Sequence, residues 1–152
     1  MEIERKFLVT DNRWRSSVQK SEKIVQFYLT DETQHPTVRL RIKEDTGLLT
    51  IKYPSVSSTV LAREEFEYRI PVADIVAQRH LAKGKIIQKT RHHVLGPDNH
   101  IWEVDVFESP DPHLILAEIE LKTLDEQIEL PVWIAKEVTS DKKYRNLMMA
   151  FS

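Results

Sequence analysis

The sequence predicts a mainly β protein of the α+β class, in which an antiparallel sheet closes around a polar interior. Strand-like stretches along most of the chain alternate charged with apolar residues, and side chains of a strand point to opposite faces with a period of two. Their charged faces repeatedly place two like charges at positions i and i+2, where they repel each other and gain little in water. A closed sheet would instead turn these faces towards one shared space and remove the exposed edges of the sheet.

The first such stretch is EIERKFLV at residues 2–9, where Glu2, Glu4 and Lys6 share one face. Later stretches repeat the pattern with these aligned polar residues: Arg39, Arg41 and Lys43 in VRLRIK; Thr50 and Lys52 in LLTIKY; Arg63, Glu65, Glu67 and Arg69 in REEFEYRI; Lys85, Lys89 and Arg91 in KIIQKTRHHV; Glu103 and Asp105 in WEVDVF; Glu118 and Glu120 in ILAEIEL. A solvated sheet face explains any one strand, but the repetition favours an enclosed surface. Because removing ions from water is costly, that interior must hold water, metal ions and a polyanionic ligand.

Two helices are expected beside the sheet. In residues 72–84, VADIVAQRHLAKG, apolar positions recur at helical spacing after Pro71, and Gly84 is a plausible stop. We expect this helix to cover an apolar outer patch. The stretch TSDKKYRNLMMAF, residues 139–151, begins with good N-cap residues and continues with helix formers, so it predicts a terminal helix.

The connections between these elements are read from Pro, Ser, Gly and Asn content. Residues 54–60 and 96–100 are expected to be loops. Residues 124–131 are compatible with either a short helix or a connector. The three tryptophans, Trp14, Trp102 and Trp133, are expected to be packing residues.

Composition indicates one compact domain over residues 1–152, with 41% hydrophobic and 30% charged residues. No apolar run approaches the ~20 residues that cross a bilayer, and acids stand where a signal peptide would be apolar, so a cytoplasmic protein without a membrane partner is expected. A net charge of −2 argues against a nucleic-acid binder. No cysteine is present for thiolate chemistry, and three glycines do not build a glycine-rich phosphate loop, so phosphate binding must use side chains.

These residues together resemble the CYTH domain family, also called triphosphate tunnel metalloenzymes, and within it the bacterial inorganic triphosphatases. The opening EIERK matches the ExExK signature; RLR, TIK, EEFEY, KTR, WEVDVF and AEIE follow in the expected order, and EVTSDKKYRN closes the set. The resemblance covers almost the whole chain. It implies an eight-stranded antiparallel β tunnel with a few flanking helices, a divalent metal and a triphosphate ligand.

The resemblance also implies roles for individual residues. The metal ligands for Mg²⁺ or Mn²⁺ would be Glu2, Glu4, Asp105, Glu118 and Glu120, since hard oxygen ligands suit those ions. The phosphate-binding cations would be Lys6, Arg39, Arg41, Lys52 and Arg91. Glu65, Glu67 and Glu103 would hold those cations in place.

The implied reaction is hydrolysis of inorganic tripolyphosphate to pyrophosphate and phosphate by in-line attack of water. The resemblance makes Lys89 the base, which requires a pKa well below the ~10.4 of a free lysine; nearby arginines supply the right sign of perturbation. Tyr28, on the same side of KIVQFYLT as Gln26, could assist by hydrogen bonding, or it is a wall residue.

Other functions stay open at this point. A class IV-type adenylyl cyclase or a thiamine or nucleoside triphosphatase would use a similar tunnel, although Thr37 stands where animal thiamine triphosphatases carry tryptophan. A polyphosphate-binding module without catalysis is the alternative outside enzymes. The apolar outer faces of the strands are compatible with a homodimer.

Overall fold

The computed structural model describes residues 1–57 and 60–152. In this part of the chain the strands are β1 (Glu2–Val9), β2 (Val18–Tyr28), β3 (Thr37–Lys43), β4 (Thr46–Lys52), β5 (Leu61–Arg63), β6 (Glu65–Ile70), β7 (Lys83–Leu95), β8 (Ile101–Ser109), β9 (Ile115–Glu120) and β10 (Ile134–Glu137). The α-helices are α1 (Val72–Gln78) and α2 (Asn146–Ala150). Short 3-10 helices span Arg13–Ser17, Arg79–Leu81, Pro97–Asn99 and Lys142–Tyr144.

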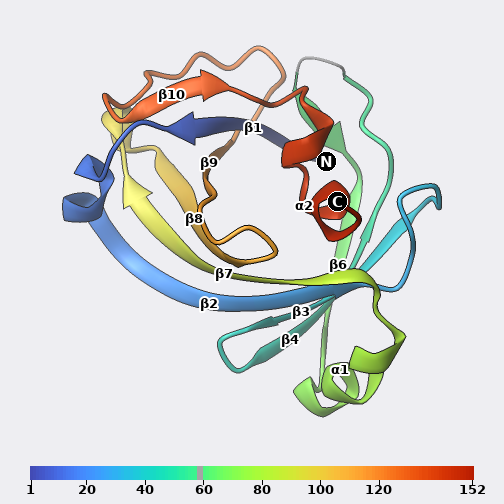
Figure 1. The fold of residues 1–152 in the computed structure, drawn as a ribbon. Helices are drawn as coiled ribbons and strands as arrows, with labels where there is room; N and C mark the ends of the chain where they lie inside the picture. The colour runs from blue at the N-terminus through green and yellow to red at the C-terminus, as the bar shows by residue number, and fades with distance from the viewer. Residues whose placement is uncertain (58–59) are drawn as a thin grey trace.

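The strands form one antiparallel sheet in the order β10-β1-β9-β8-β7-β2-β3-β4-β6 (Figure 1). Only Glu64 separates β5 from β6; β6 pairs with β4, and β5 pairs with β1. This bent segment therefore joins the two ends of the sheet. If β5 and β6 count as one bent strand, the ring contains eight strands, the number predicted for the tunnel. β10 is an additional strand that pairs with the second half of β1.

Two hydrophobic clusters lie outside the ring of strands, and a third, which includes Tyr28 and Ile87, packs on the inward face against α2. One cluster packs the three tryptophans, Trp14, Trp102 and Trp133, against the outer faces of β1, β8 and β9. In a smaller cluster, Ile75 of α1 packs against Phe27 and Leu40. The first helix thus covers an outer apolar patch, as expected. α2 lies instead within the curve of the sheet (Figure 1).

The first helix is shorter than the sequence predicted. It ends at Gln78, and a 3-10 turn continues only to Leu81. The prediction that Gly84 stops this helix is wrong, because Gly84 lies within β7 with φ +69°. A Cβ atom at this position would collide with the carbonyl oxygen of Ala150 in α2, so the glycine allows the C-terminal helix to approach the strand.

The C-terminal stretch also differs from the predicted continuous helix. It forms the 3-10 turn Lys142–Tyr144, an extended Arg145 and then the five-residue α2. Residues 124–131 are a connector, and 96–100 contain a 3-10 turn. Of the loop predicted at 54–60, residues 54–57 and 60 carry no helix or strand, and 58–59 lie outside the described residues. Among the described residues, no helix is long and apolar enough to cross a membrane.

Candidate active site

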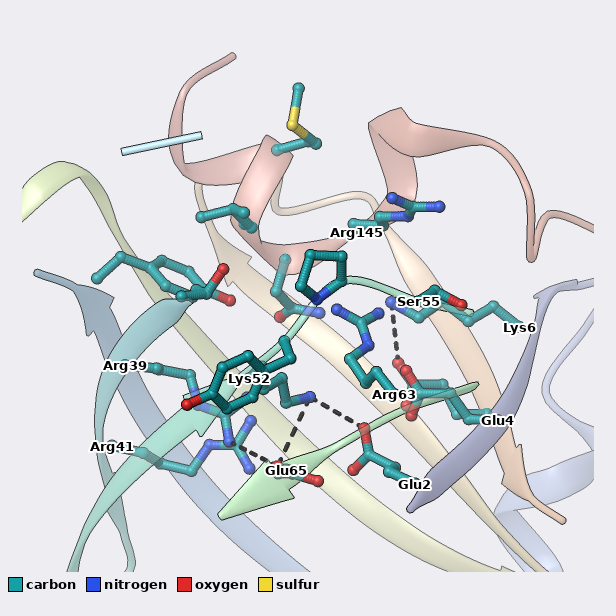
Figure 2. A pocket seen from close by; sticks show the side chains of 18 of the residues that line it. Glu2, Glu4, Lys6, Arg39, Arg41, Lys52, Ser55, Arg63, Glu65 and Arg145 are labelled. Atoms are coloured by element: carbon teal, nitrogen blue, oxygen red, sulfur yellow. Dashed lines mark hydrogen bonds and ion pairs between the residues drawn. The ribbon is translucent and has the colours of Figure 1, made fainter. Parts of the chain in front are cut away.

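The inner face of the sheet encloses a cavity of about 760 Å³. All the predicted site residues line it except Asp105: Glu2, Glu4, Lys6, Tyr28, Arg39, Arg41, Lys52, Lys89, Arg91, Glu118 and Glu120. Figure 2 shows Arg39 and Arg41 on one side of this pocket and Glu2 and Glu4 on the other. The charged faces do enclose a shared polar space.

One side of the cavity, here called the acidic wall, consists of Glu2, Glu4, Glu118 and Glu120. Strand register builds it, since Glu4 of β1 pairs with Glu120 of β9. Burial, together with the charge of Glu118, raises the pKa of Glu4 to about 7. Burial and neighbouring carboxylates also raise the pKa of Glu2 and of Glu120. The acidic wall therefore carries more negative charge than the protein itself neutralises.

Glu118 differs from the rest of the acidic wall because cations offset its burial. Lys6 Nζ lies 3.4 Å from its Oε1. This ammonium and the Arg91 guanidinium hold the pKa of Glu118 at about 2, although burial acts in the opposite direction. Glu4 and Glu120, in contrast, make no side-chain ion pair or hydrogen bond within the described residues. Their free carboxylate oxygens are hard donors of the kind that Mg²⁺ and Mn²⁺ prefer. Within the described residues no three acids or histidines converge on one ion position, so the wall suits an ion held by one or two carboxylates.

The opposing side, here called the cationic wall, consists of Arg39, Arg41, Lys52 and Arg91. The fifth predicted cation, Lys6, lies on β1 on the same side of the pocket as Glu4 (Figure 2). Arg39 donates to Thr50 Oγ1 at 3.2 Å, and Arg41 Nε donates to Gln26 Oε1 at 2.8 Å. Arg41 has no ion-pair partner among the described residues. Burial, with the positive charges of Arg39 and Arg91, lowers its pKa to about 9. This guanidinium is therefore oriented by a neutral amide and lacks a counter-ion.

Three acids were predicted to hold these cations, and the contacts agree for two of them. Glu65 lies 3.9 Å from Arg39 and 3.7 Å from Lys52. Glu103 lies 3.4 Å from Arg91. The third acid, Glu67, forms no ion pair with a cation of residues 1–57 or 60–152, and it accepts a hydrogen bond from Thr50 Oγ1 at 3.2 Å.

Lys89 is the most deeply buried charged group at the cavity, with 1% of its surface exposed. Its Nζ lies 2.7 Å from Asp105 Oδ2 and donates to Asn146 Oδ1 at 3.0 Å. Burial, together with Arg91 and Arg41, lowers the pKa of Lys89 to about 7, against the opposing pull of Asp105. Burial was absent from the sequence argument, which credited the arginines alone.

Asp105 lies behind the cavity surface. Both of its oxygens accept from Arg91, at 2.8 and 2.9 Å, and Oδ2 also contacts Lys89. These two cations hold the pKa of Asp105 far below its ordinary value in spite of burial. Tyr28 is buried at the cavity wall, opposite Arg39 in the β2–β3 register.

The CYTH domain family matches residues 1–148. The chain belongs to the CYTH domain family. An inorganic triphosphatase of Acetivibrio thermocellus is 35% identical over 146 residues, which cover 95% of this chain and 90% of that protein. An inorganic triphosphatase of Nitrosomonas europaea is 33% identical over 153 residues, 99% of this chain and 97% of its own length. A crystal structure of the inorganic triphosphatase NE1496 has a TM-score of 0.70 and 32% identity, and the match covers 100% of this chain and 95% of that one.

The lining residues of this CYTH domain that were not predicted as site residues include Arg63, Arg145 and Asn146. Asn146 begins α2, and its Oδ1 accepts from both Lys89 Nζ and Gln26 Nε2, the latter at 3.2 Å. The C-terminal segment therefore supplies part of the cavity. EVTSDKKYRN had entered the family resemblance as a motif, and its residues Lys142, Arg145 and Asn146 line the cavity. The charge alternation offered no signal for them because they do not lie in a strand.

Proposed function

We propose that this CYTH protein is a metal-dependent inorganic triphosphatase that hydrolyses tripolyphosphate to pyrophosphate and phosphate. The observation that carries the proposal is a cavity in which an acidic wall faces a cationic wall beside a buried lysine of lowered pKa. Tripolyphosphate needs cations and a metal for recognition and no platform for an organic group. All the residues assigned below come from one chain, so the chemistry does not depend on a homodimer.

The acidic wall would hold Mg²⁺ or Mn²⁺. Such an ion normally binds through one or two carboxylates, waters and substrate phosphate oxygens, which matches a wall whose Glu4 and Glu120 oxygens are free. When bound, the ion would neutralise charge on the transferring phosphoryl group. We assign Asp105 to the same acidic set, with a supporting role, because Arg91 and Lys89 already occupy its oxygens.

The cationic wall would bind the phosphoryl oxygens. Arginine offers a planar fork for two phosphate oxygens, and the Arg41 fork is oriented by Gln26 without being neutralised by a carboxylate. Charge that develops on the phosphoryl oxygens would therefore meet cations that are already in place.

Lys89 would accept a proton from the attacking water. A neutral amine has two hydrogens and one lone pair, and the contacts to Asp105 and Asn146 use both hydrogens. The lone pair is then left for a water proton. A pKa of about 7 keeps a large share of the amine neutral near pH 7. Tyr28 would add a hydroxyl at the same wall.

A substrate screen tests this proposal. Phosphate release should be measured from tripolyphosphate, ATP, thiamine triphosphate and pyrophosphate with Mg²⁺ or Mn²⁺, alongside a cyclic AMP assay on ATP. We expect tripolyphosphate to be the preferred substrate. Preference for an organic triphosphate, cyclic AMP formation, or binding without turnover would each overturn the assignment.

A further inference from the structure

Arg63 and Arg145 are two cavity-lining cations that the proposed mechanism leaves without a role. Arg63 ends β5, and Arg145 is the extended residue between the last 3-10 turn and α2. Figure 2 shows them together on the side of the pocket near Ser55, apart from Arg39 and Arg41. They come from distant parts of the chain, so the fold itself brings them to one place.

Neither of these guanidinium groups has a partner within the described residues. The Nε atoms of Arg63 and Arg145 are buried and make no hydrogen bond, and neither side chain forms an ion pair there. Two other arginines show satisfied contacts: Arg5 holds Glu137 at 2.9 and 2.7 Å, and Arg91 holds Asp105 through two bonds. The buried Nε of Arg39, which is already assigned to phosphate binding, likewise makes no hydrogen bond. Burying a charged donor without a partner costs free energy. A bound anion would therefore stabilise these two arginines.

The two charges also act on each other. Burial, and then the positive charge of Arg63, lower the pKa of Arg145. Glu2 lies opposite Arg63 in the β1–β5 register, but neither arginine forms an ion pair within the described residues. The two guanidinium groups therefore repel each other in one polar space, and an anion between them would offset that repulsion. Among anions, phosphate is well matched because its oxygens accept the paired donors of a guanidinium.

The position of Arg145 links this pair to the reaction. The next residue, Asn146, accepts a hydrogen bond from Lys89 Nζ. Met149 and Ala150 anchor α2 in a buried cluster. An anion at Arg145 is therefore held by the same short segment that contacts the proposed base.

We propose that Arg63 and Arg145 form a further phosphoryl-binding subsite of the tunnel, separate from Arg39 and Arg41, which holds part of the tripolyphosphate chain. The inference rests on the proposed function for the identity of the ligand. It assigns to the C-terminal segment a direct share in substrate binding, beyond its contact with Lys89.

Binding without turnover tests the subsite. The proteins are wild type, Arg63→Gln, Arg145→Gln and the double variant, and the probe is sodium tripolyphosphate titrated calorimetrically in EDTA. Each single substitution should weaken binding by roughly tenfold to a hundredfold, the range expected for lost charge-assisted hydrogen bonds. The second substitution should cost less than the first, because both arginines act on one ligand group. Lys143→Gln is the matched control, since it removes an exposed cation of the same segment that does not line the tunnel cavity.

Melting temperature separates binding from a structural role. Without ligand, Arg145→Gln should melt at or above the wild-type temperature, because it removes an unpaired buried charge. The rise in melting temperature that tripolyphosphate causes should be smaller in this variant than in wild type. Wild-type affinity in Arg145→Gln, or a ligand-free melting temperature several degrees below wild type, would overturn the subsite. Phosphate release by the wild type with Mg²⁺ tests the proposed function separately: tight binding that depends on Arg145 without any release would reject the hydrolase and leave the subsite standing.

Discussion

Lys89→Met is the most direct test of the proposed base. Methionine keeps an unbranched apolar stem of four atoms, with sulfur in place of Cδ, and removes the amine that contacts Asp105 and Asn146. At pH 7 a lysine with the ordinary pKa of 10.5 is neutral in roughly one molecule in 3,000, whereas a pKa of about 7 makes about half of the molecules neutral. Burial in the tunnel therefore raises the fraction of Lys89 that is neutral and able to accept a proton at pH 7.

The wild-type kcat should rise about tenfold per pH unit below pH ~7 and level off at alkaline pH, as Lys89 loses its proton. Lys89→Met should lower kcat by about 10² to 10⁴-fold, with a modest change in KM, and should lose this rising limb. The assay is steady-state phosphate release at saturating tripolyphosphate and Mg²⁺ over a range of pH. Lys85→Met is the control, because Lys85 lies on the same strand but is exposed and outside the tunnel cavity.

The lowered pKa can also be checked without turnover. The folded pKa of Lys89 is about 7 and its ordinary value is 10.5, so between these values the unfolded chain binds more protons than the folded one. The Lys89 contribution to the free energy of unfolding therefore rises with pH through that window, and the penalty is fully present below pH 7. Denaturant titrations of wild type and Lys89→Met should differ in this slope. If Lys89→Met kept a near-normal kcat, or kept the wild-type pH profile while its KM rose, the role of Lys89 as a base would be refuted and Lys89 would be another phosphate-binding cation.

Four further outcomes are expected. Arg41→Ala should raise KM for tripolyphosphate roughly tenfold or more and also lower kcat, since a phosphate contact is lost in ground and transition states; unchanged kinetics would exclude Arg41 from substrate binding. EDTA should abolish hydrolysis and excess Mg²⁺ should restore it, whereas chelator-insensitive release would contradict the metal assignment. Asn146→Asp places a carboxylate beside Lys89, so the pKa of Lys89, and with it the rising limb of the kcat–pH profile, should move up by roughly 1 pH unit; a profile that stays in place would count against the contact between residue 146 and Lys89. Gly84→Ala should lower the free energy of unfolding by more than about 1 kcal/mol in denaturant titration, because φ is +69° there and α2 packs against it; wild-type stability would contradict the close approach.

The tunnel could be predicted because its defining feature is local. A strand fixes which residues share a face, so Arg39 and Arg41, or Glu118 and Glu120, are placed together by spacing alone. Like charges so placed need an enclosed partner of opposite sign, and the family resemblance supplied the number of strands. The cavity accordingly contains the predicted residues of both walls.

The remaining features depend on contacts between distant segments, which spacing does not encode. Gly84 is a sensible helix stop until the approach of Ala150 is known. Asp105 alternates in phase with Glu103, yet its bonds to Arg91 and Lys89 keep it behind the cavity surface. Arg145 and Asn146 reach the cavity only because the expected terminal helix breaks before them.

The charges of the tunnel also connect substrate binding to the state of the base. Arg41 and Arg91 contribute to the lowered pKa of Lys89, while Asp105 opposes it. Tripolyphosphate bound to these arginines would offset their charge, and we expect it to raise the pKa of Lys89 when it binds alone. A divalent cation that arrives with the substrate brings positive charge back into the cavity and counteracts that rise. In the proposed mechanism the acidic wall would thus do more than hold an ion, because by bringing metal and polyanion together it would keep Lys89 able to accept a proton while the substrate is bound.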